Sequence, residues 1–332
     1  MENVGLPRIA VLGCGYWGKN LVRNFRDLGA LSLVCDVASS GRESARAIAP
    51  NIECSESFES AFSRQDIDAV VLATPAETHE ELTVRAVRAG KDVYVEKPMA
   101  LTVAQGRNML LEATTHDRIL MVGHILEYHP AVIKLRELIE RDELGQILYI
   151  FSNRLNFGKI RSEENALWSF APHDIAVILR LLGTSPIEVT SVGGNFVNPS
   201  LADVTVSCLR FESGQRAHVF VSWLNPFKEQ KLVIVGKKKM AVFNDMNAKE
   251  KLVLHDQRVD IESEIPVLRK GEVEVVKLEP IEPLREECAH FLSCVSSRKV
   301  PTTDGQSGIE VLRVLEACQT SLETSGAPVL LK

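Results

Sequence analysis

The stretch Ile9-Ala10-Val11-Leu12-Gly13-Cys14-Gly15-Tyr16-Trp17-Gly18 decides the fold of this chain. A short apolar run typical of a strand enters the pattern G-x-G-x-x-G, and the spacing of apolar residues after it predicts a helix. The next apolar run ends in Asp36, 18 residues after the last glycine. A strand, this glycine pattern, a helix and an acid at this distance together indicate a dinucleotide-binding site.

Each glycine of the pattern stands where a side chain would obstruct the site. Gly13 permits a tight turn, Gly15 lets a pyrophosphate approach the backbone, and Gly18 lets the helix pack close to the strand. N–H groups of the loop and the positive end of the helix then face the phosphates. Tyr16 and Trp17 lie in this loop, so we count them with the glycines as cofactor-binding residues.

Asp36 indicates which dinucleotide binds. Its carboxylate can accept hydrogen bonds from the ribose hydroxyls of adenosine and would repel a 2′-phosphate. The residues that follow it bring no cation before Arg42. The sequence therefore predicts NAD, rather than NADP, as the cofactor.

Composition excludes several classes of partner. The chain has 332 residues and a net charge of −6, which argues against nucleic acids and anionic membranes as partners, because both select a basic surface. We expect no secretory leader and no membrane-spanning segment. The seven cysteines form no C-x-x-C pair, which favours a reducing, cytoplasmic setting. The eight histidines lack the spacing of metal ligands, so no metal site is predicted.

Two domains are expected from a change of pattern near residue 123. Residues 1–122 alternate short apolar strands with helices, which predicts a doubly wound parallel sheet of the Rossmann kind. Residues 123–332 predict an α+β domain, with a large, mainly antiparallel sheet between Pro186 and about Leu254. The chain ends in two helices, near 283–298 and 305–324, and the last can pack back on the first domain.

A second informative segment is Asp92-Val93-Tyr94-Val95-Glu96-Lys97-Pro98. Ligands of open parallel sheets bind beyond the carboxyl ends of the strands, where Lys97 is expected. A lysine beside a cationic nicotinamide should have a lowered pKa and could accept a proton from an alcohol. Glu96 could hold its ammonium group, and the bond before Pro98 can be cis. The alternative is an ordinary surface lysine at a strand end.

These motifs, in this order, resemble the Gfo/Idh/MocA family of NAD(P)-dependent sugar and cyclitol oxidoreductases. The resemblance runs nearly end to end. Its motifs are the glycine loop, Ala73-Thr74-Pro75 with His79, Glu96-Lys97-Pro98, His124 to Pro130, Ala171-Pro172-His173-Asp174 and Pro301-Thr302-Thr303-Asp304-Gly305.

The resemblance implies roles for individual residues. Lys97 would be the catalytic acid/base, and His173 would hold or relay the proton of the reacting hydroxyl. Thr74, Pro75 and His79 would line the nicotinamide ribose, with Glu96 and Lys97 beside them. Ser169 departs from the family, which usually has an aspartate four residues before the histidine. The alternative is that His173 only caps or packs its helix.

The loop before the His173 helix is the expected substrate site. It is rich in hydrogen-bonding side chains, and an arginine fork matches phosphate or carboxylate geometry. Its arginines could instead pair with Glu163 and Glu164. The segment 168–174 most resembles the family branch that acts on nucleotide-linked amino sugars. The predicted substrate-binding residues are Lys97, Arg154, Arg161, Asn165, Trp168, Ser169 and His173.

The resulting hypothesis is an NAD-dependent dehydrogenase. It would oxidise the C3 hydroxyl of a UDP-linked N-acetyl-hexosamine, or of its uronate, to a 3-keto sugar. One alternative is a dehydrogenase of inositol or a simple sugar, and another is an NAD-binding sensor without catalysis, which Ser169 would favour. The resemblance also implies a homodimer or homotetramer, because sheets of this family associate face to face.

Overall fold

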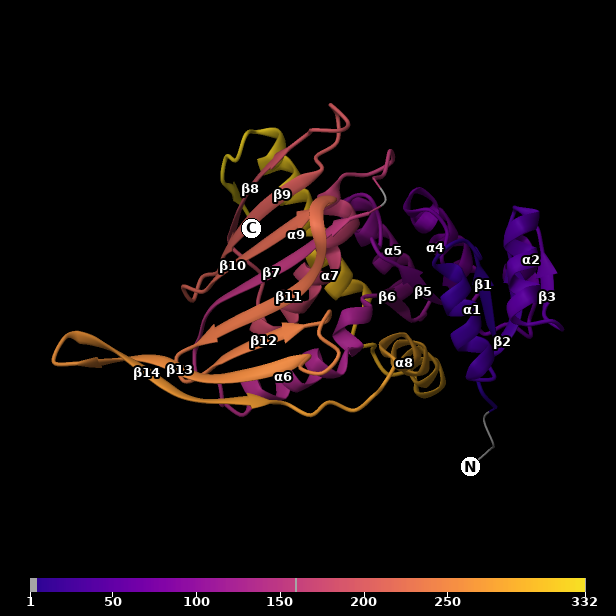
Figure 1. Cartoon of the computed structure of the whole chain (residues 1–332). Helices are drawn as coiled ribbons and strands as arrows, with labels where there is room; N and C mark the ends of the chain where they lie inside the picture. Colours follow the sequence, from indigo (N-terminus) through magenta and orange to yellow (C-terminus); the bar gives the residue numbers. More distant parts are fainter. Residues whose placement is uncertain (1–4, 159, 332) are drawn as a thin grey trace. The chain divides into compact units, whose positions relative to one another are not determined.

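The computed structural model describes residues 5–158 and 160–331, in two compact units (Figure 1). The first unit comprises the chain through Tyr128 together with Ile281–Leu312, and the second comprises His129–Pro280 and the chain from Arg313. The sequence predicts one division, at residue 122/123, with the last helix packing back on the first domain. No helix among the described residues is long and apolar enough to cross a membrane.

A six-stranded parallel sheet forms the centre of the first unit, as predicted. Its strand order, β3-β2-β1-β4-β5-β6, reverses direction after β1, which defines a doubly wound sheet. The central strands are buried on both faces: β1 and β4 are apolar throughout, and β5 is apolar between Asp92 and Glu96 at its two ends. The strands are β1 (Ile9–Leu12), β2 (Leu31–Cys35), β3 (Glu53–Ser55), β4 (Ala69–Leu72), β5 (Asp92–Glu96) and β6 (Leu120–Gly123).

Helices connect these strands. α5 begins at a capping box: the Thr102 side chain accepts from the Gln105 N–H, and the Gln105 side chain accepts from the Thr102 N–H. The helical elements are α1 (Gly18–Asp27), α2 (Ser39–Ile48), α3 (Glu59–Ser63), η1 (Ala76–Thr78), α4 (His79–Arg88), α5 (Val103–Thr115), η2 (Ile125–Tyr128) and α8 (Pro283–Ser297).

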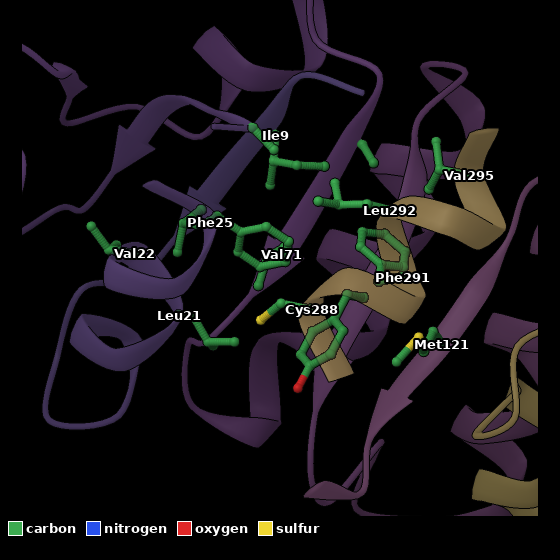
Figure 2. Close-up of a cluster of buried hydrophobic side chains, with 14 of the residues drawn as sticks. Ile9, Leu21, Val22, Phe25, Val71, Met121, Cys288, Phe291, Leu292 and Val295 are labelled. Carbon is green, nitrogen blue, oxygen red and sulfur yellow. The ribbon is translucent and has the colours of Figure 1, made fainter. Parts of the chain in front are cut away.

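Helix α8 completes the core of the first unit from a distant part of the sequence. Figure 2 shows Phe291 and its neighbours on α8 directed toward apolar side chains of the sheet and of α1. The Phe291 ring meets those of Phe25 and Tyr94 edge to face, at centroid distances of 6.5 and 5.8 Å. α8 therefore belongs to the dinucleotide-binding fold, although it follows the second unit's sheet in the chain.

The second unit contains a nine-stranded sheet of order β14-β13-β12-β11-β7-β10-β9-β8-β15. Among its described pairings only β7 with β10 is parallel, which confirms the predicted mainly antiparallel sheet. Its strands are β7 (Ile147–Phe157), β8 (Glu188–Gly194), β9 (Val204–Arg210), β10 (Arg216–Ser222), β11 (Leu224–Gly236), β12 (Met240–Asn244), β13 (Leu252–Glu262), β14 (Ile265–Val275) and β15 (Val329–Leu330).

Three further helices are α6 (Pro130–Glu140), α7 (Ala166–Leu182) and α9 (Gly305–Glu323). α7 packs against β7, β9 and β10 through buried residues such as Ile175 and Ile178. The long hairpin of β13 and β14 extends the sheet beyond the predicted limit near Leu254 (Figure 1). β14 was not predicted from the sequence because the polar stretch 269–272 interrupts its apolar alternation.

Candidate functional site

The glycine loop between β1 and α1 has the shape that a dinucleotide requires. Gly13 has φ +92°, and a Cβ there would lie 2.7 Å from the Ala73 carbonyl oxygen. A Cβ on Gly18 would overlap the carbonyl of Gly13, whereas one on Gly15 would meet nothing within 4 Å. The backbone is thus tightly packed on both sides of an open, exposed position at Gly15. This cradle leaves room for a pyrophosphate against the backbone.

Asp36, at the tip of β2, is fixed beside this loop. Its Oδ2 accepts from the N–H of Cys14 at 2.7 Å, and its Oδ1 accepts from the N–H of Ala38 at 2.9 Å. A Cβ on Gly41 would overlap the carboxylate, so glycine is needed at that position in α2. The guanidinium of Arg42 donates to the backbone carbonyls of Asp36 and Val37. The nearest following cation is therefore already held by backbone oxygens.

His79 joins two loops at the carboxyl ends of β4 and β5. Its Nε2 lies 3.0 Å from the Thr74 carbonyl oxygen and its Nδ1 3.0 Å from that of Pro98. The side chain is buried, and burial lowers the pKa of His79. A neutral imidazole donates to only one of these carbonyls at a time. His79 holds the loop of Thr74 and Pro75 against the loop that follows Lys97.

Glu96 links the end of β5 to the glycine loop. Its Oε1 accepts from the indole N–H of Trp17 at 2.6 Å, and its Oε2 accepts from the N–H of Lys97 at 3.2 Å. Burial raises the pKa of Glu96, while Trp17 and the charge of Lys97 act against that rise. The Lys97–Pro98 peptide bond is cis. Lys97 thus follows a strand end whose carboxylate is hydrogen-bonded to Trp17 of the glycine loop.

Two residues near Glu96, Tyr94 and Glu287, were not predicted from the sequence as part of the site. The hydroxyl of Tyr94 lies 3.2 Å from Glu96 Oε1 and 3.0 Å from Glu287 Oε2 on α8. A Cβ on Gly123 would lie 2.7 Å from that hydroxyl, so this glycine makes room for the cluster. Two features of the sequence could have indicated these residues. Tyr94 is two residues before Glu96 and hence on the same face of the strand, and Glu287 is an acid among the apolar positions of α8.

His124, directly after β6, is a third buried polar residue beside this cluster. No hydrogen-bond partner of either ring nitrogen lies within the described residues. Burial, and secondly the charge of Lys97, lower the pKa of His124 to about 4. The imidazole is therefore neutral at physiological pH, with a donor and an acceptor that no described group uses.

In the second unit, the start of α7 holds two of the predicted substrate residues. Asn165 is the N-cap of α7, and its Oδ1 accepts from the N–H of Trp168 at 3.1 Å. The Asn165 amide and the Trp168 indole N–H both donate to Oε1 of Gln319 on α9, at 2.8 and 3.2 Å. Asn165 is buried, whereas Trp168 is half-buried. Asn165 consequently sets the start and orientation of the helix that carries Trp168.

Arg154 and Asp174 form a buried pair between β7 and α7. The arginine Nε and Nη2 donate to the two carboxylate oxygens at 2.7 and 3.1 Å, and Ser152 Oγ donates to Oδ1 at 2.6 Å. Asp174 therefore faces the sheet, and His173, the next residue on the helix, faces about a hundred degrees away. His173 is half-buried, and Ser169, one turn earlier, is buried. Asp174 thus accepts from two of the five N–H donors of Arg154.

Arg161 differs from Arg154 in exposure and partner. Its Nη1 lies 3.1 Å from Glu164 Oε1, with more than a third of the arginine side chain exposed. This is one of the two ion pairs that the alternative interpretation of the loop predicted. An exposed pair of this kind is weak and readily exchanged, so the guanidinium remains able to meet an anion.

The structure thus assembles two groups of predicted residues, one in each unit. In the first unit, the residues that follow β1, β2, β4 and β5 meet at the carboxyl edge of the parallel sheet, where open sheets bind ligands. In the second unit, Arg161 pairs with Glu164 just before α7, Asn165 and Trp168 lie at the start of that helix, and Arg154 pairs with Asp174 farther along it. The first group can hold a dinucleotide beside a lysine, and the second offers an indole, an imidazole and an exchangeable arginine.

Comparison with known proteins identifies the class that this fold and these loops define. Residues 7–124 match the family model of the oxidoreductase family with an NAD-binding Rossmann fold, and residues 132–242 match the GFO/IDH/MocA C-terminal domain. The two matches follow each other in chain order. The chain belongs to the Gfo/Idh/MocA oxidoreductase family.

Three relatives illustrate the range of this family. A 2,7-anhydro-N-acetylneuraminate hydratase of Mediterraneibacter gnavus is 30% identical over 206 residues, which cover 59% of this chain and 54% of the relative. The chain thus spans about half the length of that relative. The scyllo-inositol 2-dehydrogenase (NAD(+)) of Bacillus subtilis is 27% identical over 240 residues, which cover 66% and 68% of the two chains.

The third relative is similar along almost its whole length. The UDP-N-acetylglucosamine 3-dehydrogenase of Acidithiobacillus ferrooxidans is 25% identical over 318 residues, which cover 95% of this chain and 97% of the relative. Its solved structure superimposes with a TM-score of 0.84 at 24% identity, over 96% of this chain and 97% of that chain. The likeness of the two structures extends over both units.

Proposed function

We propose that this protein is an NAD-dependent dehydrogenase that oxidises a ring hydroxyl of a sugar, with Lys97 as the catalytic acid/base. One observation carries the proposal. Lys97 follows the carboxyl end of β5, and its neighbour Glu96 is hydrogen-bonded to Trp17 of the glycine loop. The lysine is thereby tied to the part of the fold that would hold the cofactor.

The chemistry follows from these positions. NAD, when bound, supplies the acceptor for the hydride that leaves the carbinol carbon. Lys97, as the neutral amine, takes the proton of the hydroxyl, so that the carbon becomes a carbonyl. Glu96 stabilises the ammonium group that forms. His173 would hold the hydroxyl oxygen by a hydrogen bond, and Thr74 and Pro75 would line the nicotinamide ribose.

For the substrate we propose a UDP-linked N-acetyl-hexosamine or its uronate, oxidised at C3. The nearly full-length likeness to the Acidithiobacillus ferrooxidans enzyme supports this substrate. Within the chain, Trp168 offers an aromatic face for a ring, and Arg161 offers an exchangeable guanidinium for a diphosphate. Arg154 acts mainly by holding Asp174 and α7, which orients the residues around it.

For the cofactor we propose NAD in preference to NADP. Asp36 is held by two backbone N–H groups at the position that a ribose hydroxyl would approach. Its negative charge would repel a 2′-phosphate. Arg42, which could otherwise neutralise such a phosphate, donates to backbone carbonyls and lies 3.8 Å from Glu56.

A substrate panel tests the function. The purified protein is incubated with NAD and, separately, UDP-N-acetylglucosamine, its uronate, scyllo-inositol and 2,7-anhydro-N-acetylneuraminate, and products are identified by mass spectrometry. We expect a product two hydrogens lighter from one of the UDP-sugars. Lys97→Met should lower kcat by roughly 10²–10⁴-fold, while NAD binding measured by tryptophan fluorescence persists. Full activity of Lys97→Met would refute the proposed role.

An inositol dehydrogenase is the second candidate, and the likeness to the Bacillus subtilis enzyme favours it. Inositol carries no phosphate, so its oxidation would not depend on Arg161. Arg161→Gln separates the two functions: it should raise KM for a UDP-sugar and leave KM for inositol unchanged. A protein that binds NAD and converts no member of the panel would contradict both dehydrogenase candidates and favour the sensor.

We also propose that the open face of the nine-stranded sheet pairs with a second copy of the chain. On this face the ring of Phe151 stacks on His218 at 5.1 Å and lies 6.3 Å from the ring of Tyr149. Tyr149 is exposed, and Phe151 and His218 are partly exposed. Exposed aromatic side chains that stand together are typical of protein interfaces.

A further inference from the structure

Glu96, Tyr94 and Glu287 form a buried hydrogen-bonded network in the first unit, next to Lys97. The hydroxyl of Tyr94 lies 3.0 Å from Glu287 Oε2 on one side and 3.2 Å from Glu96 Oε1 on the other. Tyr94 and Glu287 are fully buried, and Glu96 is 7% exposed. The function proposed above assigns no role to Tyr94 or Glu287.

The hydrogen bonds of Tyr94 require a proton on one of the two carboxyl groups. A phenol carries a single proton, so Tyr94 can donate to Glu96 or to Glu287 but not to both. If both carboxyl groups were ionised, the remaining contact would bring two acceptors together inside the protein, without water to separate them. A protonated carboxyl group that donates to the Tyr94 oxygen removes this conflict.

The partners of each carboxyl group indicate where that proton lies. Glu96 accepts two more hydrogen bonds, from Trp17 and from the N–H of Lys97, and it lies beside the positive charge of Lys97. Glu287 Oε1 has no hydrogen-bond partner within residues 5–158 and 160–331. A negative charge is therefore stabilised on Glu96 and would be unsupported on Glu287.

The charges around Glu287 favour the same assignment. Burial, followed by the charge of Glu96, raises the pKa of Glu287 well above its ordinary value, and Glu127 on η2 adds to that rise. The hydrogen bond from Tyr94 acts in the opposite direction. Further titratable groups near this cluster include Tyr128 on η2, Cys288 on α8, Lys97 after β5, His124 after β6, and the ion pair of Arg23 on α1 with Glu282.

We propose that Glu287 is a positioning residue that stays protonated at neutral pH and, through Tyr94, shares the charge of the Glu96 carboxylate and holds this carboxylate fixed beside Lys97. The Glu287 carboxyl group then donates a hydrogen bond to the Tyr94 oxygen, and the Tyr94 hydroxyl donates one to Glu96. Each hydrogen bond in such a series strengthens the next, so the charge on Glu96 is shared with its donors. The effect of Glu287 on the rate rests on the function proposed for Lys97. The protonation state of Glu287 does not.

Infrared spectroscopy tests the protonation state without reference to activity. A protonated carboxyl group has a C=O stretching band separate from the bands of carboxylates. The spectrum of the wild-type protein at pH 7 minus that of Glu287→Gln should contain this carboxylic acid band, shifted in D₂O. If the difference contains a lost carboxylate band instead, Glu287 is ionised and the proposal is wrong.

The pH dependence of kcat tests the positioning role. Tyr94→Phe deprives Glu96 of one donor, so its charge stabilises the Lys97 ammonium more strongly, and the acid limb of the profile should move to higher pH. We expect a shift of about half a pH unit or more. Glu287→Leu should shift the limb in the same direction, and Glu287→Gln should return it toward the wild-type position because its amide can donate to Tyr94.

Glu286→Gln is the matched control for the Glu287 variants, because it changes a neighbouring acid of the same helix. Glu286→Gln, on the exposed side of the same helix, should leave the profile unchanged. A Glu287→Gln profile that shifts as far as that of Glu287→Leu would contradict the proposal. If Lys97→Met proves fully active while the infrared band is present, the proposed function fails and the protonation of Glu287 stands.

Discussion

The indole N–H of Trp17 donates to Glu96 Oε1 at 2.6 Å, which joins the glycine loop to the end of β5, directly before Lys97. These residues are 79 positions apart in the chain. The hydrogen bond makes the position of the lysine depend on the loop that would hold the cofactor. A change in this loop should therefore affect the chemical step as well as cofactor binding.

Trp17→Phe removes this hydrogen bond and keeps an aromatic ring. Because a hydrogen bond to a charged group contributes about 1.5–3 kcal/mol, we expect kcat to fall by roughly tenfold. The acid limb of the kcat–pH profile should also move to higher pH, since Glu96 loses a donor. Steady-state kinetics across pH measures both. A rise in KM for NAD with kcat unchanged would show that Trp17 serves only cofactor binding.

Asp36→Asn should weaken the preference for NAD over NADP. The amide oxygen can still accept from the N–H of Cys14, so the loop is retained, but the charge that repels a 2′-phosphate is removed. We expect the ratio of kcat/KM for the two cofactors to fall by roughly tenfold or more. Glu43→Gln, an exposed acid on the following helix, is the control. An unchanged ratio in Asp36→Asn would contradict the proposed cofactor preference.

Removal of Arg154 should destabilise the second unit. Arg154→Met leaves the buried Asp174 carboxylate without its ion partner, and breaking a buried pair costs about 3–5 kcal/mol. The double variant Arg154→Met/Asp174→Asn should recover most of that loss, because no unpaired charge remains. Urea unfolding followed by circular dichroism measures both values. Equal stability of Arg154→Met and the wild type would show that the pair contributes little.

Glu287 should make the stability of the protein fall as pH rises. Its folded pKa is raised, so between its unfolded pKa of about 4.3 and its folded pKa the native state holds the extra proton. Unfolding then becomes easier by up to about 1.4 kcal/mol per pH unit. Glu287→Gln does not titrate, so its Tm advantage over the wild type should grow from pH 5 to pH 8. A constant difference, as expected for Glu286→Gln, would argue that Glu287 is ionised in the folded protein.

Phe151→Asp should dissociate the proposed oligomer. A carboxylate on the open face would be buried without a partner when two sheets pair, which costs several kcal/mol. Size-exclusion chromatography with light scattering should then give the mass of a single chain. Arg107→Asp, an exposed charge reversal on α5, is the control. A monomeric wild-type protein would contradict the proposed pairing.

Much of the first unit followed from the sequence because its signals are local. The glycine loop, Asp36 and Lys97 each lie at the end of a short apolar strand, and parallel strands bring their carboxyl ends to one edge. Less of the second unit could be predicted from the sequence. Polar residues interrupt the apolar alternation of β14, and the pairing of Arg154 with Asp174 depends on how α7 packs on β7.

The sequence by itself determined the parallel sheet, the cofactor loop and the position of Lys97 at a strand end, because hydrophobic periodicity and glycine spacing act over a few residues. Only the tertiary structure decided what surrounds that lysine's strand. The contact of Glu287 with Tyr94 spans 193 positions of the chain. It exists because α8 returns to the first unit to bury its apolar face, and this burial brings an acid into a place where water cannot stabilise its charge.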